Sequence, residues 1–434
     1  MELIAPDHPQ YDVLRRPALP HYRAIRPALI ARCTSPADVA EALAYARTHA
    51  LPFALRGGGH CFAGHSSTTG LLLELSGMNA ITPGPTRSRP GDSRAEARTP
   101  GDLPREDLPR GDRRVTPAAP QLAAIGAGAR LADVYRGLHE HGLTIPAGCG
   151  PTVGIAGLTL GGGLGLLGRR YGLTCDRLVG ATVVLADGRV VECAQGREPD
   201  LFWALRGAGG GQFGVVTSLE FAAVPSPTAT RFTITWPRTH AADVIAAWQT
   251  WAPDAPDTIT ASLAVTADEV RVFGATLAPF DSGLLTGEVE LRNGLSWPDL
   301  KRSFSDEDTP GDSVIHSKSE FFSSPLPRDT IAQLLAAGCE LSFTPMGGAY
   351  NRVPADAIAF AHRGERFLLE HTGTDQTAVR RSWSIAHQHA SGRLYPNFPD
   401  PDLTDPTAYH GPNYERLLAI KQAYDPDHIF GGIR

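Results

Sequence analysis

Ten residues near the N-terminus have the types and spacing that could do chemistry, the segment RGGGHCFAGH from Arg56 to His65. Three glycines follow the apolar run 52–55, a pattern that predicts a strand ending in a tight turn. Glycine lets the main chain approach a ligand closely, and exposed N–H groups on such a turn suit a diphosphate. His60 comes directly after the third glycine, so we expect its imidazole to lie close to the ligand that the turn binds.

A second glycine cluster, 161–165, lies further along the chain. Two separate glycine-rich turns and one placed histidine predict a large phosphate-containing cofactor. The pattern Gly-x-Gly-x-x-Gly also occurs, at 163–168 and 209–214. The acidic residue expected about 20 positions after the first match is Asp187, which is needed for a hairpin turn. A nicotinamide site of the Rossmann type is therefore the weaker interpretation.

A lone histidine usually has a structural or solvent-facing role, but the three adjacent glycines favour a cofactor role for His60. His65, five residues on, could share a metal ion with it. No set of carboxylates or cysteines completes such a site, so we predict no metal.

Length and composition bound the class of protein. With 434 residues we expect two domains, and 42% hydrophobic with 20% charged residues is typical of a globular protein. The net charge of −6 argues against nucleic acid as a partner. No long apolar run predicts a membrane span, and the N-terminus lacks the apolar core of a secretory signal. Six scattered cysteines form neither a disulfide framework nor a zinc spacing, so we expect a cytoplasmic protein.

Local signals predict the elements that position these residues. Ser35-Pro36-Ala37-Asp38 is a helix start with a capping residue, and Ala186-Asp187-Gly188 is a hairpin turn between 182–185 and 189–193. In the first half we also expect strands at 52–56, 71–75 and 121–125, a helix at 131–141, and a helix, glycine turn and strand over 201–221. Beyond 227 we expect helices at 240–252, 329–337 and 409–423, and strands at 259–266, 269–277 and 340–345. Residues 83–117, rich in Pro, Gly, Asp and Arg, predict a long solvated loop.

Four segments carry a resemblance to a known family. They are RGGGHCFAGHSS, PAGCGPTVGIAGLTLGGGLGLLGRRYGLTCDRL, DLFWALRGAGGGQFGVVTSLEF, and YPNFPDPDL with a closing NYERLLAIKQAYDP. In this order they resemble the berberine-bridge-enzyme-like FAD-linked oxidases of the vanillyl-alcohol-oxidase superfamily. The resemblance implies an α+β fold, with a two-part PCMH-type FAD-binding domain and an inserted α+β substrate domain with an antiparallel sheet. The implied bounds are 1–225 (with 83–117 as a flexible insert), 226–385, and 386–434 as the returning segment.

The resemblance also implies roles for individual residues. The first turn would surround the FAD diphosphate, His60 would bond covalently to the flavin, and Tyr395 with Asn397 would form the Tyr-x-Asn pattern beside its ring. The implied cofactor-binding residues are Arg56, Gly57, Gly58, Gly59, His60, Gly64, His65, Gly148, Thr152, Val153, Gly157, Gly161, Gly162, Gly163, Gly165, Tyr171, Val216, Tyr395 and Asn397.

The sequence departs from the family pattern at two places. Many relatives carry a second flavin link through a cysteine in a Cys-x-x-Val-Gly context; here that position is Gly150, and Cys149 lies one residue earlier. We therefore expect a single covalent link, at His60. Relatives often repeat a tyrosine after the one that matches Tyr409, whereas this chain has His410.

The family chemistry is hydride transfer to the flavin while a base removes a proton from the substrate. Tyr395 is the candidate base if its neighbours lower its pKa from about 10; the alternative is that it only packs on the flavin. In relatives a valine at the position of Val153 accompanies oxidase behaviour.

We expect an oxidase of a small molecule, such as a secondary-metabolite alcohol, sugar or phenol, with O2 as second substrate and H2O2 as co-product. The alternatives are a flavin monooxygenase, an oxidative cyclase, or an FAD-containing protein that only binds a ligand. Oligomeric state is left open.

Overall fold

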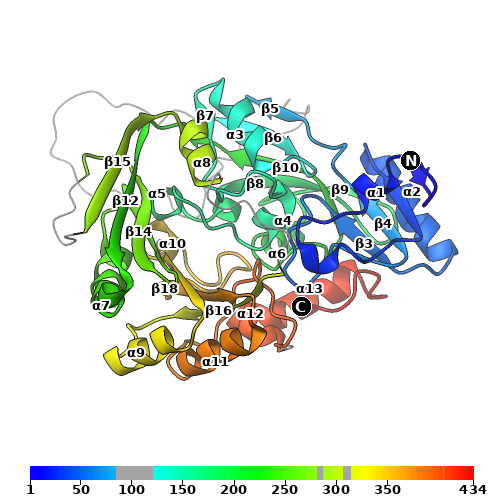
Figure 1. Cartoon of the computed structure of the whole chain (residues 1–434). Helices are drawn as coiled ribbons and strands as arrows, with labels where there is room; N and C mark the ends of the chain where they lie inside the picture. The colour runs from blue at the N-terminus through cyan, green and yellow to red at the C-terminus, as the bar shows by residue number, and fades with distance from the viewer. Residues whose placement is uncertain (85–120, 281–286, 306–313, 404) are drawn as a thin grey trace, which may run out of the picture.

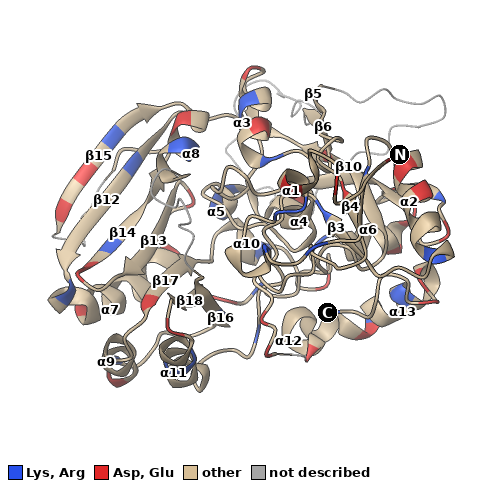
Figure 2. Ribbon diagram, turned by 45° about the vertical axis from the view of Figure 1, so that its right-hand side comes forward, with Lys and Arg blue, Asp and Glu red and all other residues tan. Residues whose placement is uncertain are grey.

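Three main β-sheets and their helices make up the protein, which confirms the predicted α+β class (Figure 1). The coordinates are a computed structural model that describes residues 1–84, 121–280, 287–305, 314–403 and 405–434. Acidic and basic residues are interspersed along the described helices and strands (Figure 2). No described helix is both long and apolar enough to cross a membrane.

The first sheet contains the strand that leads into the glycine turn. Its order is β1-β2-β4-β3, formed by Glu2–Ile4, Leu29–Arg32, Leu71–Glu74 and Phe53–Arg56. The last three strands are parallel, and helix α2 (Pro36–Thr48) makes the crossover that parallel strands require. The helix begins at the predicted cap, because Ser35 Oγ accepts the Asp38 N–H while the Asp38 carboxylate accepts the Ser35 N–H.

The second sheet is antiparallel and has five strands, in the order β5-β6-β10-β8-β9. These are Ile81–Pro83, Leu122–Gly126, Val215–Ala222, Leu178–Val184 and Val190–Ala194. β8 and β9 form the predicted hairpin, with Gly188 at a φ of 88° in its turn. The predicted helices appear as α3 (Leu131–His139) and α6 (Pro199–Leu205).

The third sheet has seven antiparallel strands, in the order β15-β12-β14-β13-β17-β18-β16. These are Glu288–Leu295, Ala229–Pro237, Glu269–Thr276, Ile259–Val265, Glu340–Pro345, Phe367–Gly373 and His316–Phe322. Helices α7 (Ala241–Trp251), α9 (Arg328–Ala336) and α11 (Gln376–His387) cover one face (Figure 1). A buried apolar cluster fills the space between this face and the helices. The opposite face packs against the helix Trp297–Ser305 at β14, where the rings of Phe273 and Phe304 lie 6.3 Å apart, and its β16 end lies near Tyr395, 6.1 Å from the ring of Phe321.

The C-terminal segment returns to the first sheet. It comprises α12 (Pro406–His410), a 3-10 turn at Gly411–Asn413 and α13 (Tyr414–Tyr424). The single helix expected at 409–423 is therefore wrong at its start, because Gly411 has a φ of 53° and interrupts the helix. Beyond α13 the ring of Phe430 lies 5.8 Å from that of Phe53 in β3, so the two ends of the chain share one core.

The sequence patterns missed several elements of the third sheet and its helices, namely β12, β15, β16, β18, α8 (Trp297–Ser305) and α11. Short elements complete the chain: α1 (Tyr11–Leu14), β7 (Leu143–Thr144), α4 (Ile155–Leu160), α5 (Gly168–Tyr171), β11 (Val224–Pro225), α10 (Ala349–Arg352) and 3-10 turns at Pro20–Tyr22, Thr174–Arg177, Arg238–His240 and Ala252–Asp254. The loop expected at 83–117 lies, beyond residue 84, outside the described residues. The domain bounds stay a prediction; the one at 225/226 falls between β11 and β12.

Candidate active site

The Arg56 side chain holds the first glycine turn in place. It is 5% exposed, and its guanidinium donates to the carbonyl oxygens of Leu14, Arg15 and Ser66 and to the Ser67 hydroxyl. These bonds tie the end of β3 to the N-terminal segment and to the far side of the turn. The guanidinium is thus committed to the protein, and it is the main chain of the turn that remains available for a diphosphate.

His60 leaves this turn beside the segment that precedes α4. Its Nε2 lies 2.9 Å from the Thr152 hydroxyl oxygen. Burial, with a smaller contribution from the Arg130 charge, lowers the pKa of His60 to about 4, so its imidazole is neutral at physiological pH. Because Thr152 occupies Nε2, Nδ1 is the nitrogen left to form a bond.

The first turn and this segment approach each other through glycines. A Cβ at Gly58 would lie 2.2 Å from the Gly154 nitrogen, and a Cβ at Gly154 would lie 2.4 Å from the Gly58 nitrogen. Any side chain at either position would push the two segments apart. These two glycines therefore serve main-chain packing, which brings His60, Thr152 and Val153 together.

The second glycine cluster meets the Tyr-x-Asn pattern from the other end of the chain. The N–H groups of Gly163 and Leu164 donate to the Tyr395 hydroxyl oxygen, at 3.0 and 3.1 Å, across 232 and 231 residues of sequence. Asn397 Nδ2 donates to the same oxygen at 3.0 Å and to the Leu158 carbonyl at 2.8 Å. A Cβ at Gly161 would lie 2.2 Å from Asn397 Oδ1, so this glycine makes room for the asparagine.

The environment of Tyr395 acts on its pKa in two opposite directions. Burial raises the pKa to about 12, while the hydrogen bonds from Asn397, Leu164 and Gly163 act to lower it. A pKa lowered by the neighbours was the condition for Tyr395 to act as a base, and here desolvation outweighs their hydrogen bonds. Three N–H donors converge on one phenolic oxygen, which suits a phenolate better than a neutral hydroxyl with its two lone pairs.

Aromatic side chains from both parts of the chain surround Tyr395. The ring centroids of Phe321, Phe360 and Phe398 lie 6.1, 6.3 and 5.1 Å from its own. Phe321 belongs to β16, so the seven-stranded sheet contributes directly to this site. Neither Phe321 nor Tyr350 was predicted from the sequence. The Tyr350 hydroxyl donates to the Gly165 carbonyl and accepts the Gly165 N–H. Neither residue stands in a pattern that indicates its position.

The remaining predicted residues lie in different settings. A Cβ at Gly157 would meet nothing within 4 Å, so the main chain of α4 is open to a ligand there. The Gly148 carbonyl accepts from the Tyr135 hydroxyl. His65 is exposed, Val216 is buried in β10, and the Tyr171 ring lies 5.4 Å from the Arg170 guanidinium. A Cβ at Gly64, at a φ of 74°, would collide with the Tyr22 ring. Among the described residues, no group of His, Cys, Asp or Glu side chains could hold a metal ion.

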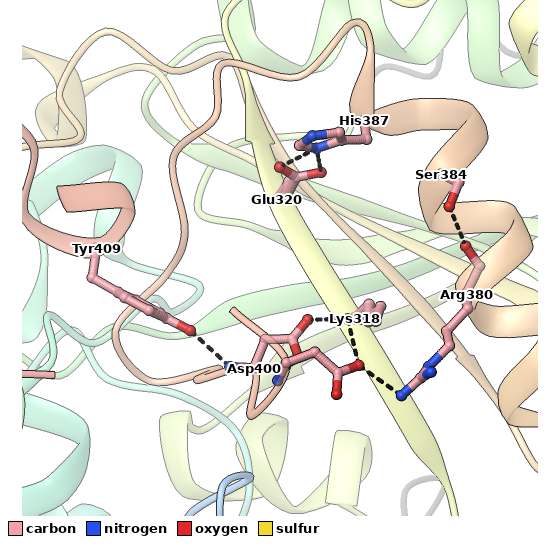
Figure 3. A network of polar contacts seen from close by, with 8 residues as sticks. Lys318, Glu320, Arg380, Ser384, His387, Asp400 and Tyr409 are labelled. Carbon is pink, nitrogen blue, oxygen red and sulfur yellow. Dashed lines mark hydrogen bonds and ion pairs between the residues drawn. The ribbon is translucent and has the colours of Figure 1, made fainter. Parts of the chain in front are cut away.

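A buried ion pair anchors the segment that follows the Tyr-x-Asn pattern (Figure 3). Lys318 Nζ of β16 lies 2.5 Å from Asp400 Oδ2 and 3.1 Å from Asp402 Oδ2, and Arg380 of α11 also pairs with Asp402. The Asp400 N–H donates to the Tyr409 hydroxyl. These contacts fix the chain just after Tyr395 and Asn397 to the sheet, and the sequence contained no signal for them.

A second pair lies on the same face of β16 (Figure 3). His387 Nδ1 is 2.9 Å from the carboxylate oxygens of Glu320, whose side chain is 3% exposed. Burial raises the pKa of Glu320. This face of β16 packs against α11, so the pair stabilises the sheet rather than lining the site around Tyr395.

Comparison with known proteins tests these expectations. A family model described as an FAD binding domain matches residues 27–83 and 114–194, and one described as berberine and berberine like matches 394–431. An uncharacterized FAD-linked oxidoreductase of Bacillus subtilis is 31% identical over 99% of this chain and 95% of its own. Chitooligosaccharide oxidase of Gibberella zeae is 28% identical over 93% of this chain and 86% of its own.

The solved structures give the fold. Glucooligosaccharide oxidase of Acremonium strictum, described with a 6-S-cysteinyl, 8α-N1-histidyl FAD, superposes with a TM-score of 0.81. The match is 23% identical and covers 100% of this chain and 96% of that one. The expected two-part FAD-binding fold with an inserted antiparallel sheet is thereby confirmed. The chain belongs to the berberine-bridge-enzyme-like FAD-linked oxidoreductases.

Proposed function

We propose that this FAD-dependent oxidoreductase is an oxidase of a small hydroxylated molecule, with its flavin bonded covalently to His60. Bound FAD would accept a hydride from a substrate C–H bond and pass the electrons to O2, giving H2O2. The observation that carries this proposal is the convergence of His60, the glycine segments and Tyr395 from distant parts of the chain.

The residues present suit FAD. The glycine turns bring main chain close together at Gly58 and Gly154, and Gly157 leaves main chain open. His60 is neutral, and its Nδ1 is available to form a carbon–nitrogen bond. In ring nomenclature Nδ1 corresponds to N1, the atom named for the histidyl link of glucooligosaccharide oxidase. Gly150 in place of the family cysteine supports a single link.

Tyr395 is our candidate for the catalytic base. In this role it would take a proton from a substrate hydroxyl as the hydride leaves the adjacent carbon. The three N–H groups around its oxygen would stabilise the phenolate, and the buried aromatic rings keep water away. Its raised pKa makes the phenolate scarce at neutral pH, which gives the proposal a measurable consequence.

Near Tyr395, the face of the sheet that lies opposite α7, α9 and α11 is polar, which supports a hydroxylated substrate. Residues alternate along β16, so Ser317 and Ser319 share a face with Phe321, which contacts Tyr395. The Ser317 hydroxyl donates to the Glu370 carboxylate at 2.6 Å, and Ser319 lies directly opposite Glu370. Ser319 Oγ is buried and has no hydrogen-bond partner within the described part of the chain. A substrate hydroxyl could satisfy it.

A panel of sugars, alcohols and phenols, screened with peroxide detection, tests the proposal. The yellow protein should bleach with its substrate under anaerobic conditions and recover in air with one H2O2 formed per product. Oxygen incorporated into the product without free peroxide would establish a monooxygenase, and ring closure without added oxygen a cyclase. Substrate turnover with no role for O2 would overturn the oxidase assignment.

The free state of the cysteines indicates the cellular compartment in which the protein works. All six are free thiols, four of them buried. Free thiols fit a reducing compartment, so we propose a cytoplasmic enzyme. Fractionation of cells that produce the full-length protein would test this.

A further inference from the structure

A buried lysine that has no acidic partner among the described residues lies beside the segment that leads to the flavin site. Lys301 of α8 is 3% exposed. Its Nζ donates to the carbonyl oxygens of Ala147 and Gly148, at 2.7 and 3.1 Å, and lies about 5 Å from the ring centroids of Tyr135 and Trp297. Within the described residues, no carboxylate pairs with it. Burying an ammonium group without a counter-charge is costly, and burial accordingly lowers the pKa of Lys301.

A thiol also lies beside this amine. The Sγ atom of Cys149 lies 3.6 Å from Lys301 Nζ, across 152 residues of sequence. Cys149 is half-buried, whereas Lys301 is 3% exposed. The proposed flavin chemistry uses neither residue. Their contact links α8 to the segment that holds His60 through Thr152.

We propose that Cys149 and Lys301 form a reversible sulfur–nitrogen cross-link when hydrogen peroxide oxidises the cysteine. In the first step the thiol and H2O2 give a sulfenic acid and water, so sulfur loses two electrons to the peroxide. In the second step the neutral amine attacks that sulfur, the S–N bond forms, the S–O bond breaks, and water leaves with a proton from the amine. The net change is the loss of one hydrogen each from the thiol and the amine, with two waters formed per H2O2.

The geometry favours the second step. A sulfenic acid condenses with a nitrogen nucleophile within its reach, and reacting atoms about 3–3.5 Å apart are close to an attack distance. The sulfur and nitrogen are already at 3.6 Å, and the lowered pKa increases the neutral fraction of the amine. A cross-link here would fasten α8 to the main chain at residues 147–149, four residues before Val153. The flavin site would thus respond to peroxide.

The supply of peroxide in the cell depends on the proposed oxidase function, but the reaction between Cys149 and Lys301 does not. The test therefore uses added H2O2 on the purified holoprotein without substrate. After exposure, free thiols are alkylated and the protein is digested with a protease that does not cut at lysine. Mass spectrometry should find the peptides that contain Cys149 and Lys301 joined, with the loss of two hydrogen atoms. Dithiothreitol should separate them again.

Three comparisons make the result specific. Lys301→Arg keeps a cation and hydrogen-bond donors but offers no neutral amine, so the joined peptides should disappear. Cys149→Ser should abolish them as well. Cys61, another half-buried thiol, should be oxidised without being joined to a lysine. A joined pair that retains an oxygen atom, or Cys149 oxidised to its sulfinic acid with Lys301 unmodified, would overturn the proposal. The measurement on the unmutated protein decides the question even if a variant folds poorly.

Discussion

Replacing Tyr395 by phenylalanine tests both the proposed base and the packing around it. The substitution removes the oxygen that accepts from Gly163, Leu164 and Asn397. Asn397 keeps its bond to the Leu158 carbonyl, so two main-chain N–H groups lose their acceptor. At about 1–3 kcal/mol for each buried unsatisfied group, the variant should lose roughly 2–6 kcal/mol of folding stability. Loss of a general base should slow flavin reduction by about 10²-fold or more.

Tyr350→Phe is a matched control that separates the two effects. Tyr350 is also buried, its hydroxyl is also bonded to the main chain of the second glycine cluster at Gly165, and burial also raises its pKa. The two variants should lose comparable stability in chemical denaturation. Only Tyr395→Phe should lose the base.

The pH dependence of flavin reduction identifies the base. With the pKa of Tyr395 raised to about 12, its phenolate fraction grows about tenfold for each pH unit below that value. In anaerobic rapid mixing, the reduction rate should rise with this slope from about pH 7 to about pH 10, in the unmutated protein and in Tyr350→Phe. Tyr395→Phe should be slow and independent of pH in this range. An unchanged slope in Tyr395→Phe would refute the reasoning and leave Tyr395 a packing role.

Three further predictions concern the flavin link, oxygen and the buried ion pair. Denatured protein should stay yellow, whereas His60→Ala should release its FAD on denaturation, and flavin found on Cys149 would contradict the single link. Because the pKa of His60 is about 4, its imidazole is neutral at both about pH 5.5 and about pH 7, so covalent attachment of FAD to the apoprotein should be equally fast at these two pH values. Val153→Leu should slow reoxidation by O2 and leave reduction by substrate nearly unchanged in rapid mixing, since one added methylene can close a narrow path; a parallel fall of both rates would indicate general damage. Lys318→Met leaves Asp400 as a buried unpaired charge and should cost about 3–5 kcal/mol in denaturant titration. Asp400→Asn should cost less, because Lys318 keeps Asp402 at 3.1 Å, and equal costs would show that the pair does not act as described.

Local sequence signals predicted the parts of the protein that depend on neighbouring residues. The capping box at Ser35 and Asp38, the Asp-Gly turn of the β8–β9 hairpin, and the strand that ends in the first glycine turn are all present. Each depends on hydrogen bonds or backbone angles within a few residues, so the chain encodes it without reference to the rest of the fold. The order of the glycine, histidine and Tyr-x-Asn motifs was also enough to identify the family.

Tertiary structure decided everything that depends on burial or on contacts between distant segments. β16 contains Lys318 and Glu320, and these charged residues kept the sequence pattern from indicating a buried strand. In the folded protein Asp400 pairs with Lys318 and His387 pairs with Glu320. The sequence could not show that Tyr395 meets Gly163 across 232 residues, nor that Lys301 lies beside Cys149. The sequence also could not give the direction of the Tyr395 pKa shift. Desolvation depends on which residues the folded chain packs around the phenol, and its effect on the pKa exceeds that of the hydrogen bonds.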